Sequence, residues 1–183
     1  MCFRYPEAEE DVLSNISFVA EPGKTTAIIG STGCGKSTLV NLIPRFFDVT
    51  AGTITLDGED IRDYSLKDLR ECIGFVPQKG VLFSGTIASN LRFGKEEATH
   101  EEIVKAAQIA QAEEFIEAKD EKYESHIAQS GSNVSGGQKQ RLAIARAIVK
   151  KAKIYVFDDS FSALDMKTDV KLRKALEETV RFI

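Results

Sequence analysis

The chain has 183 residues, enough for one sizeable domain, and a chain of this size buries roughly 70% of its unfolded surface. Its hydrophobic and charged fractions, 43% and 28%, are ordinary for a globular protein, and no stretch approaches the roughly 20 apolar residues of a membrane helix. The net charge of -4 argues against a general nucleic-acid binder, because such proteins contact phosphates with clustered Lys and Arg. The three cysteines lack metal-like spacing and no signal peptide is apparent, so a reducing cytosol is expected.

The first third of the sequence predicts strand, loop and helix in that order. Residues 25–30 form a short apolar run typical of a buried strand, and a glycine-rich turn leads from it into a helical pattern over residues 36–47. Residues 53–56 alternate apolar and polar side chains and end in the turn pair Asp57-Gly58. This part of the chain is therefore expected to combine α/β structure with an antiparallel β part.

The middle of the chain is mainly helical. Ser65 with Asp68 predicts a helix start, residues 73–76 return as a strand, and Thr99 with Glu102 forms a capping box. The helix after that box has its apolar positions at Ile103, Ala106, Ala107, Ala110 and Phe115.

The last third contains a second capping box, a strand and a helix. Ser135 and Gln138 start a helix, residues 154–158 read as a β-rich run, and residues 168–180 predict the last helix. The apolar stripes of the two helices are Leu142, Ala145, Ile148 and Val149, and Leu172, Leu176 and Val180. Residues 2–5 resemble the tail of a strand and the apolar end at residues 182–183 leads nowhere, so the chain is interpreted as a fragment, cut short at its C-terminus.

A phosphate-binding loop lies between the first strand and its helix. The motif G-x-x-x-x-G-K-[ST] is matched by Gly30, Ser31, Thr32, Gly33, Cys34, Gly35, Lys36, Ser37 and Thr38. The glycines let the backbone curl with its N–H groups inward around an anion. Lys36 is expected to reach the β- and γ-phosphates of a nucleotide, and the Ser37 hydroxyl to ligate Mg²⁺. The alternative is an ordinary glycine-rich turn with a solvated lysine.

An acidic residue ends the strand at residues 154–158. P-loop proteins bring a carboxylate to the second side of the metal in this way, so Asp158 is the expected metal ligand. Taken alone, an apolar run ending in Asp is also what a strand leaving the core looks like.

The run at residues 133–141 (NVSGGQKQR) resembles the signature sequence of ATP-binding cassette (ABC) proteins. Gly136 and Gly137 leave the first turn of a capped helix bare, so that Ser135, Gln138 and free N–H groups can meet a phosphate. In the family this phosphate belongs to ATP held by an opposite subunit. The resemblance therefore implies a second cassette as partner, in a head-to-tail dimer with ATP and Mg²⁺ between the subunits; a plain capping box is the alternative.

Other elements of the family follow in order over nearly the whole chain. Tyr5 resembles the aromatic residue that stacks on adenine, although Phe3 is a rival and either could be a core aromatic. Gln78 resembles the glutamine that contacts Mg²⁺ and the attacking water. Residues 162–165 (SALD) resemble the loop that crosses the dimer interface.

Residues 78–94 resemble the exporter type, in which this segment receives a coupling helix of the membrane domain. The resemblance implies one ABC domain over residues 1–183, a P-loop α/β core with an antiparallel β part and an inserted α-helical subdomain at residues 84–150. It also implies a place at the cytoplasmic face of the cell membrane, and no nucleic acid as partner.

Two departures from the family concern catalysis. Asp159 stands where the family usually has a catalytic Glu, and the missing methylene withdraws the carboxylate by roughly an ångström, a displacement that can cost about a hundredfold in rate. The switch histidine expected after Asp165 lies beyond the chain, and neither His100 nor His126 can replace it. Residues 129–141 (QSGSNVSGGQKQR), together with Asp158, Asp159 and Ser160, resemble one half of bacterial heterodimeric multidrug-type exporters, whose two cassettes are unequal, and this resemblance implies a weakly hydrolytic exporter cassette.

Two other functions stay open. The first is a fully active homodimeric exporter in which Asp159 is an adequate base. The second is a P-loop kinase or a nucleotide-binding regulatory module, although neither needs the signature or the sequence SALD.

Overall fold

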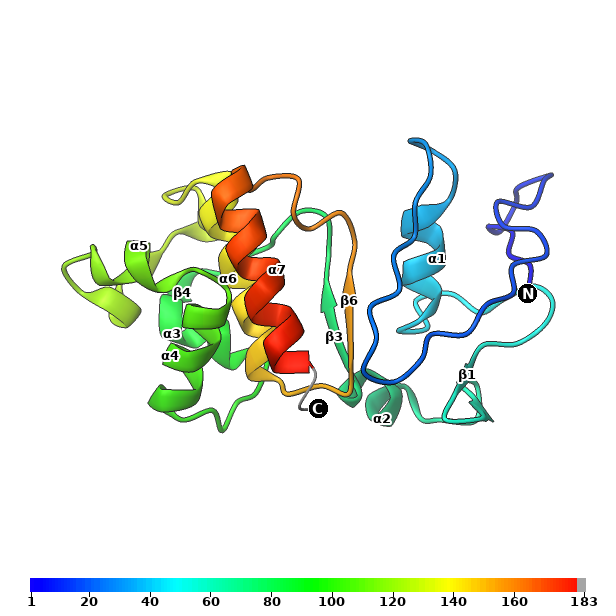
Figure 1. Cartoon of the computed structure of the whole chain (residues 1–183), viewed down its shortest axis with the longest axis horizontal. Helices are drawn as coiled ribbons and strands as arrows, with labels where there is room; N and C mark the ends of the chain where they lie inside the picture. The colour runs from blue at the N-terminus through cyan, green and yellow to red at the C-terminus, as the bar shows by residue number, and fades with distance from the viewer. Residues whose placement is uncertain (181–183) are drawn as a thin grey trace. The chain divides into compact units, whose positions relative to one another are not determined.

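The computed structural model describes residues 1–180 and divides into two compact units, Met1–Ile73 and Gly74–Ile183, with Figure 1 giving the elements of each. Each unit has its own apolar core. No helix within the described residues is both long enough and apolar enough to cross a bilayer.

The first unit is built from two short helices and a small hairpin. The elements are α1 (Lys36–Leu42), β1 (Thr55–Leu56), β2 (Glu59–Asp60) and α2 (Leu66–Glu71). Strands β1 and β2 pair antiparallel across the predicted turn Asp57-Gly58, which confirms the antiparallel part. The core of the unit consists of Phe3, Leu13, Leu39 and Leu42.

Helix α1 ends five residues earlier than the sequence pattern predicted. Its last residue is Leu42, not Phe47, and Pro44 follows closely. Proline has no N–H to continue the helical hydrogen bonds, although Ile43 before it keeps helical dihedral angles, with φ -62° and ψ -51°. Arg45 then turns with a positive φ of 55°, which separates residues 46–47 from the helix.

The predicted strand at residues 25–30 is wrong for this structure. The segment has no regular secondary structure, and Ile29 is 93% exposed. A strand exists only where a neighbour accepts its N–H groups and donates to its C=O groups. Within residues 1–180 no strand pairs with this segment, so its apolar side chains alone do not order it as a strand.

The second unit contains most of the helices. They are α3 (Ile87–Arg92), α4 (His100–Ile109), α5 (Glu113–Glu117), α6 (Gly136–Val149) and α7 (Met166–Val180), with 3-10 turns η1 (Lys122–Glu124) and η2 (Gln129–Gly131). Its strands are β3 (Ile73–Val76), β4 (Gly85–Thr86), β5 (His126–Ile127) and β6 (Ile154–Phe157). β3 pairs with β6, and β4 pairs antiparallel with β5.

The predicted helix starts are confirmed. Ser65 caps α2, Thr99 and Glu102 form the capping box of α4, and Ser135 and Gln138 form that of α6. Helix α7 begins two residues before the predicted Thr168, because the Asp165 carboxylate accepts hydrogen bonds from the Thr168 backbone at 3.0 Å and hydroxyl at 2.7 Å. An aspartate side chain in this position satisfies N–H groups that the first turn leaves without partners.

Helix α6 is the centre of the second unit. Helices α3 and α4 pack against it, and α7 contributes Leu172 and Leu176 to the same core (Figure 1). Its buried residues include the predicted stripe Leu142, Ala145, Ile148 and Val149, but also Gln140, Ala143, Ile144 and Ala147. The predicted apolar positions Ile103, Ala106, Ala107 and Ala110 are buried as well, but Phe115 lies in α5 instead of α4 and packs, partly buried, against the same core. The helix is thus enclosed on more than one face, and its polar side chains must find partners inside the unit.

The carboxylate of Glu102 ties the start of α4 to two neighbouring loops. It accepts hydrogen bonds from Lys151 at 2.6 Å, from Lys95 at 2.8 Å and from the Thr99 backbone at 3.0 Å. The hydrogen bonds from Lys151, then Lys95 and Thr99, lower the pKa of Glu102 from its usual 4.5 to about 2.

A carboxylate whose pKa is lower in the folded state stabilises the fold above its unfolded pKa. Glu102 therefore stabilises the protein above pH 4.5, and this contribution is lost as the pH falls through about 2. We expect Glu102→Gln to lower the free energy of unfolding at pH 7, and the difference from wild type to shrink between pH 4.5 and 2. Denaturant titrations over this range, with the exposed neighbour Glu101→Gln as control, test this. A difference that does not depend on pH would contradict it.

Candidate functional site

The phosphate loop in the first unit is curled by two left-handed glycines. Gly33 and Gly35 have φ angles of 84° and 92°, in the region that residues with a side chain rarely adopt. A Cβ atom at Gly30 would lie 2.5 Å from the sulfur of Cys34, and the Cys34 N–H donates to the Ser31 carbonyl at 3.3 Å. The loop folds tightly on itself.

Lys36 lies across this loop. Its ammonium donates to the carbonyls of Gly30 at 2.8 Å and Ser31 at 2.7 Å, and lies 3.8 Å from the exposed Cys34 sulfur. Ser37 is exposed, and Thr38 is buried at the start of α1. The structure thus brings together the loop residues that the motif predicted, with their one cation over the loop.

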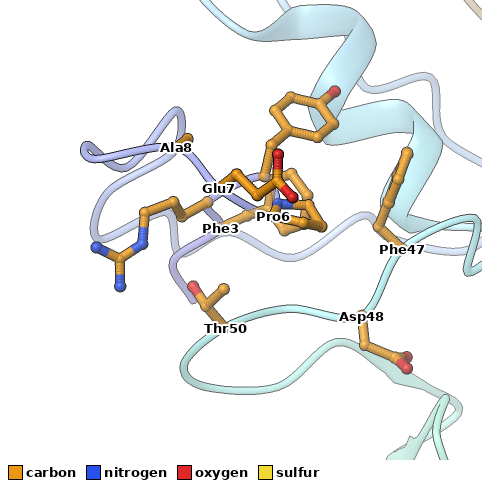
Figure 2. Close-up of a pocket in the computed structure, with 9 residues that line it drawn as sticks. Phe3, Pro6, Glu7, Ala8, Phe47, Asp48 and Thr50 are labelled. Carbon is orange, nitrogen blue, oxygen red and sulfur yellow. The ribbon is translucent and has the colours of Figure 1, made fainter.

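An aromatic cluster joins Tyr5 to the same helix. The Tyr5 and Thr38 hydroxyls share a hydrogen bond of 3.1 Å, and the Tyr5 ring meets Phe3 and Phe47 edge-on. Phe3 is only 2% exposed, whereas Tyr5 is half-buried. Beside them is an open hollow of about 520 Å³ (Figure 2), where Phe3, Pro6 and Phe47 lie on one side and Asp48 and Thr50 on another.

The acidic residues of the second unit follow strand β6. The Asp158 N–H donates to the Val76 carbonyl of β3 at 3.0 Å, and Asp159 takes a left-handed φ of 45°. The Gln78 amide donates to the Asp159 carboxylate at 3.2 Å. Two residues 81 positions apart, both named as catalytic from the sequence, therefore contact each other.

The role of Ser160 was not predicted from the sequence. It is fully buried, and its hydroxyl lies 3.0 Å from the Val76 carbonyl, 3.3 Å from that of Asp158 and 3.5 Å from that of Pro77. A small hydroxyl directly after two acids, at the end of a buried strand, is the available signal. It holds the acidic turn against the segment that leads to Gln78.

The signature forms the exposed start of α6. The Ser135 hydroxyl accepts from the Gln138 N–H at 3.2 Å, and the Gln138 side chain accepts from the Ser135 N–H at 3.0 Å. No atom lies within 4 Å of a Cβ built on Gly136, whereas at Gly137 the Ala163 carbonyl would be 3.2 Å away. The signature therefore approaches the loop at residues 162–165, and hydrogen bonds from Thr168 lower the pKa of Asp165 at the end of that loop.

The segment after Gln78 presents an exposed apolar surface over Arg146 of α6. Val81, Phe83 and Phe93 are 53%, 46% and 64% exposed, and the two phenyl rings lie 4.5 Å apart. The Arg146 guanidinium lies 5.4 Å from the Phe83 ring centre and donates to the Val81 carbonyl at 2.9 Å. Its burial lowers the pKa of Arg146 to about 10.

The fully buried Asn90 fixes the same segment from the inside. Its amide group donates to the Phe83 and Thr86 carbonyls at 2.8 and 3.0 Å, and its oxygen accepts from Phe83 and Arg146, both at 2.9 Å. The aromatic surface therefore rests on a hydrogen-bonded frame.

The side chains named as metal ligands are chemically suited to Mg²⁺. Ser37, Gln78 and Asp158 offer hydroxyl, amide and carboxylate oxygens, the hard donors that Mg²⁺ prefers. Within residues 1–180 no three His, Cys, Asp or Glu side chains gather as a metal site of their own.

Comparison with known proteins gives consistent matches. The family model described as ABC transporter matches residues 13–162. An uncharacterised ABC transporter ATP-binding protein of Mycobacterium bovis is 51% identical over 179 residues, covering 96% of this chain and 30% of that protein. A β-(1→2)glucan export ATP-binding/permease protein of Brucella melitensis is 46% identical over 176 residues, covering 96% and 29%.

A solved structure of a bacterial Atm1-family ABC exporter with ATP bound matches with a TM-score of 0.94 and 37% identity, covering 98% of this chain and 32% of that one. The chain thus spans about 30% of the length of the curated relatives it matches. These matches confirm the predicted fold class, a mixed α/β fold of the P-loop type. The chain belongs to the ABC transporter family, of which it is an ATP-binding domain.

Proposed function

We propose that the chain binds Mg-ATP and hydrolyses it to drive export across a membrane. The observation that carries this proposal is the position of Lys36, whose ammonium is held by the Gly30 and Ser31 carbonyls over the curled loop. Phosphate oxygens are stronger partners for an ammonium than neutral carbonyls, so the nucleotide would take their place. The loop N–H groups would hold the remaining phosphate oxygens.

Tyr5 is the proposed adenine contact. Its ring is half-buried, its hydroxyl is tied to Thr38 at 3.1 Å, and an open hollow lies beside it. The rival Phe3 is 2% exposed and has little surface to offer a base. Stacking on a fixed aromatic ring gives affinity without a large loss of side-chain entropy.

Gln78, Asp158 and Ser37 are the proposed Mg²⁺ ligands. An Mg²⁺ ion held by these side chains would supply positive charge that offsets the negative charge developing on the phosphate oxygens. Gln78 would also orient the attacking water, and Asp159 would accept its proton. The hydrogen bond of 3.2 Å between Gln78 and Asp159 supports a shared role in positioning this water.

The signature is proposed to act on the ATP of a second cassette. In the Ser135 capping box the hydroxyl oxygen only accepts, so its proton can be donated to a phosphate. The first N–H groups of α6 have no partner within the helix and would add to this contact. The partner is a second ABC cassette, with a heterodimer favoured.

The membrane contact is proposed at the exposed residues Val81, Phe83 and Phe93, where coupling helices of a transmembrane domain would dock. The similarity to exporters, such as the glucan export protein of Brucella melitensis, favours an export function. Docking would place the chain, as one domain over residues 1–183 with a helical subdomain at residues 84–150, at the cytoplasmic face of the membrane.

Asp159 makes the site on this chain the weaker of two in a heterodimer. Its shorter side chain already accepts a hydrogen bond from Gln78. The alternative is a homodimer in which Asp159 is an adequate base, and steady-state turnover of the purified intact homodimer distinguishes the two.

We expect Lys36→Ala to lower the affinity of this site for Mg-ATP by at least about tenfold, because hydrogen bonds to charged groups contribute about 1.5–3 kcal/mol. Calorimetric titration of the folded variant measures this. Lys24→Ala is the matched control, since Lys24 belongs to the same unit and pairs with Glu21 outside the phosphate loop. Unchanged affinity in the Lys36 variant would refute the assignment of the loop.

Two substitutions, tested one at a time in the intact complex, distinguish the ATP site of this chain from the ATP site of the partner cassette. Ser135→Arg is expected to reduce ATP turnover by about 10²- to 10⁴-fold, the contribution of a positioned catalytic group, because it blocks the partner's active site. Asp159→Asn is expected to change turnover little, because the partner carries the efficient base. If Asp159→Asn silences the complex while Ser135→Arg leaves it active, the two sites have been assigned the wrong way round.

A further inference from the structure

The buried side-chain amide of Gln140 in α6 forms hydrogen bonds with the backbone on both sides of Gln78. Gln140 is 2% exposed, and its side-chain oxygen accepts from the Gly80 N–H at 2.8 Å. Its side-chain nitrogen donates to the Pro77 carbonyl at 3.1 Å. One side chain thus bridges the residues that flank the two-residue segment of Gln78 and Lys79.

The fit between this segment and α6 leaves no room for adjustment. A Cβ atom at Gly80 would lie 2.8 Å from the Lys139 carbonyl and 3.2 Å from the Cα of Gln140. The backbone therefore lies directly on the helix, which brings the Gly80 N–H within reach of Gln140. Ser160 approaches the same segment from the acidic turn, with its hydroxyl 3.0 Å from the Val76 carbonyl.

The side chain of Gln78 is exposed, and its amide donates to the Asp159 carboxylate at 3.2 Å. An exposed side chain with several rotatable bonds populates several rotamers, and only some of them place its amide correctly. The position of the Gln78 amide therefore depends mainly on the position of its backbone. The two hydrogen bonds of Gln140 fix that backbone.

We propose that Gln140 is a positioning residue: it holds the Pro77 and Gly80 backbone so that the Gln78 amide reaches the metal and water of this chain's own ATP site. The inference rests on the proposed function of Gln78. Gln140 is buried and both of its side-chain polar atoms bind backbone groups, so it is not expected to contact nucleotide or metal itself. The effect of Gln140 on nucleotide binding must therefore depend on Gln78. A residue that only supported the fold would have the same effect whether or not Gln78 was present.

The test uses Cys34 as a reporter of this chain's own site. Cys34 is exposed within the phosphate loop, so bound nucleotide is expected to protect it from a maleimide. In the intact protein, mass spectrometry gives the concentration of a non-hydrolysable ATP analogue that half-protects Cys34, once with Mg²⁺ and once with EDTA. The ratio of the two concentrations reports the Mg²⁺-dependent part of binding, to which Gln78 contributes.

Gln140→Met removes both hydrogen bonds at similar side-chain length. We expect it to reduce the Mg²⁺-dependent gain in affinity by about 2- to 150-fold, the coupling found between contacting residues, and to leave the EDTA value unchanged. Gln78→Ala is expected to cause a similar loss. In the Gln78→Ala background, Gln140→Met should then cause no further loss of the Mg²⁺-dependent gain. Gln140→Glu keeps the acceptor for the Gly80 N–H, so its Mg²⁺-dependent gain should lie between those of Gln140→Met and the wild type.

Ile144→Val is the control, because it removes a buried methylene from the same helix and leaves both hydrogen bonds of Gln140 in place. It should leave the Mg²⁺-dependent gain unchanged. A wild-type gain in Gln140→Met, or losses that multiply in the double variant, would overturn the positioning role. Failure of any nucleotide to protect Cys34 in the wild type would instead overturn the proposed function.

Discussion

The enclosure of helix α6 is the constraint on which the second unit depends. Because α3, α4 and α7 all share its core, the helix has no wide solvent face where polar side chains could rest. Gln140 and Arg146 therefore pair with backbone carbonyls of the segment between β3 and α3. An unpaired polar group in such a place would cost about 1–3 kcal/mol, so folding of the helix core also fixes this segment.

One helix consequently serves two proposed sites. Its first turn, from Ser135, carries the signature that would contact the partner's ATP, and Gln140 in the next turn holds the backbone of Gln78 in this chain's own site. Arg146, further along, supports the exposed Phe83 and Phe93 where a membrane domain would dock. Displacement of α6 would therefore be felt at all three places, which suits the proposed link between ATP binding and a membrane partner.

Local signals in the sequence were sufficient for much of this arrangement. Capping boxes depend on residues three apart, so Thr99–Glu102 and Ser135–Gln138 could be predicted, as could the phosphate loop with its lysine. The strand predicted at residues 25–30 is absent, because strand pairing is decided by distant segments of the chain. Helix α1 ends at Leu42, earlier than predicted, because Pro44 cannot continue its hydrogen bonds. Ser160 and Gln140 were missed because their partners are backbone atoms 60 to 84 positions away, although a glutamine on an otherwise apolar helix face is a usable signal.

The central claim is that the α6 side chains hold the Gln78 segment in place before any nucleotide binds. Residue-resolved amide hydrogen exchange of the intact, nucleotide-free protein tests it most directly. The Gly80 N–H, bonded to Gln140 of α6 at 2.8 Å, should exchange as slowly as amides inside α6. Exchange of the Gly80 amide at the rate of an unstructured peptide would contradict the account.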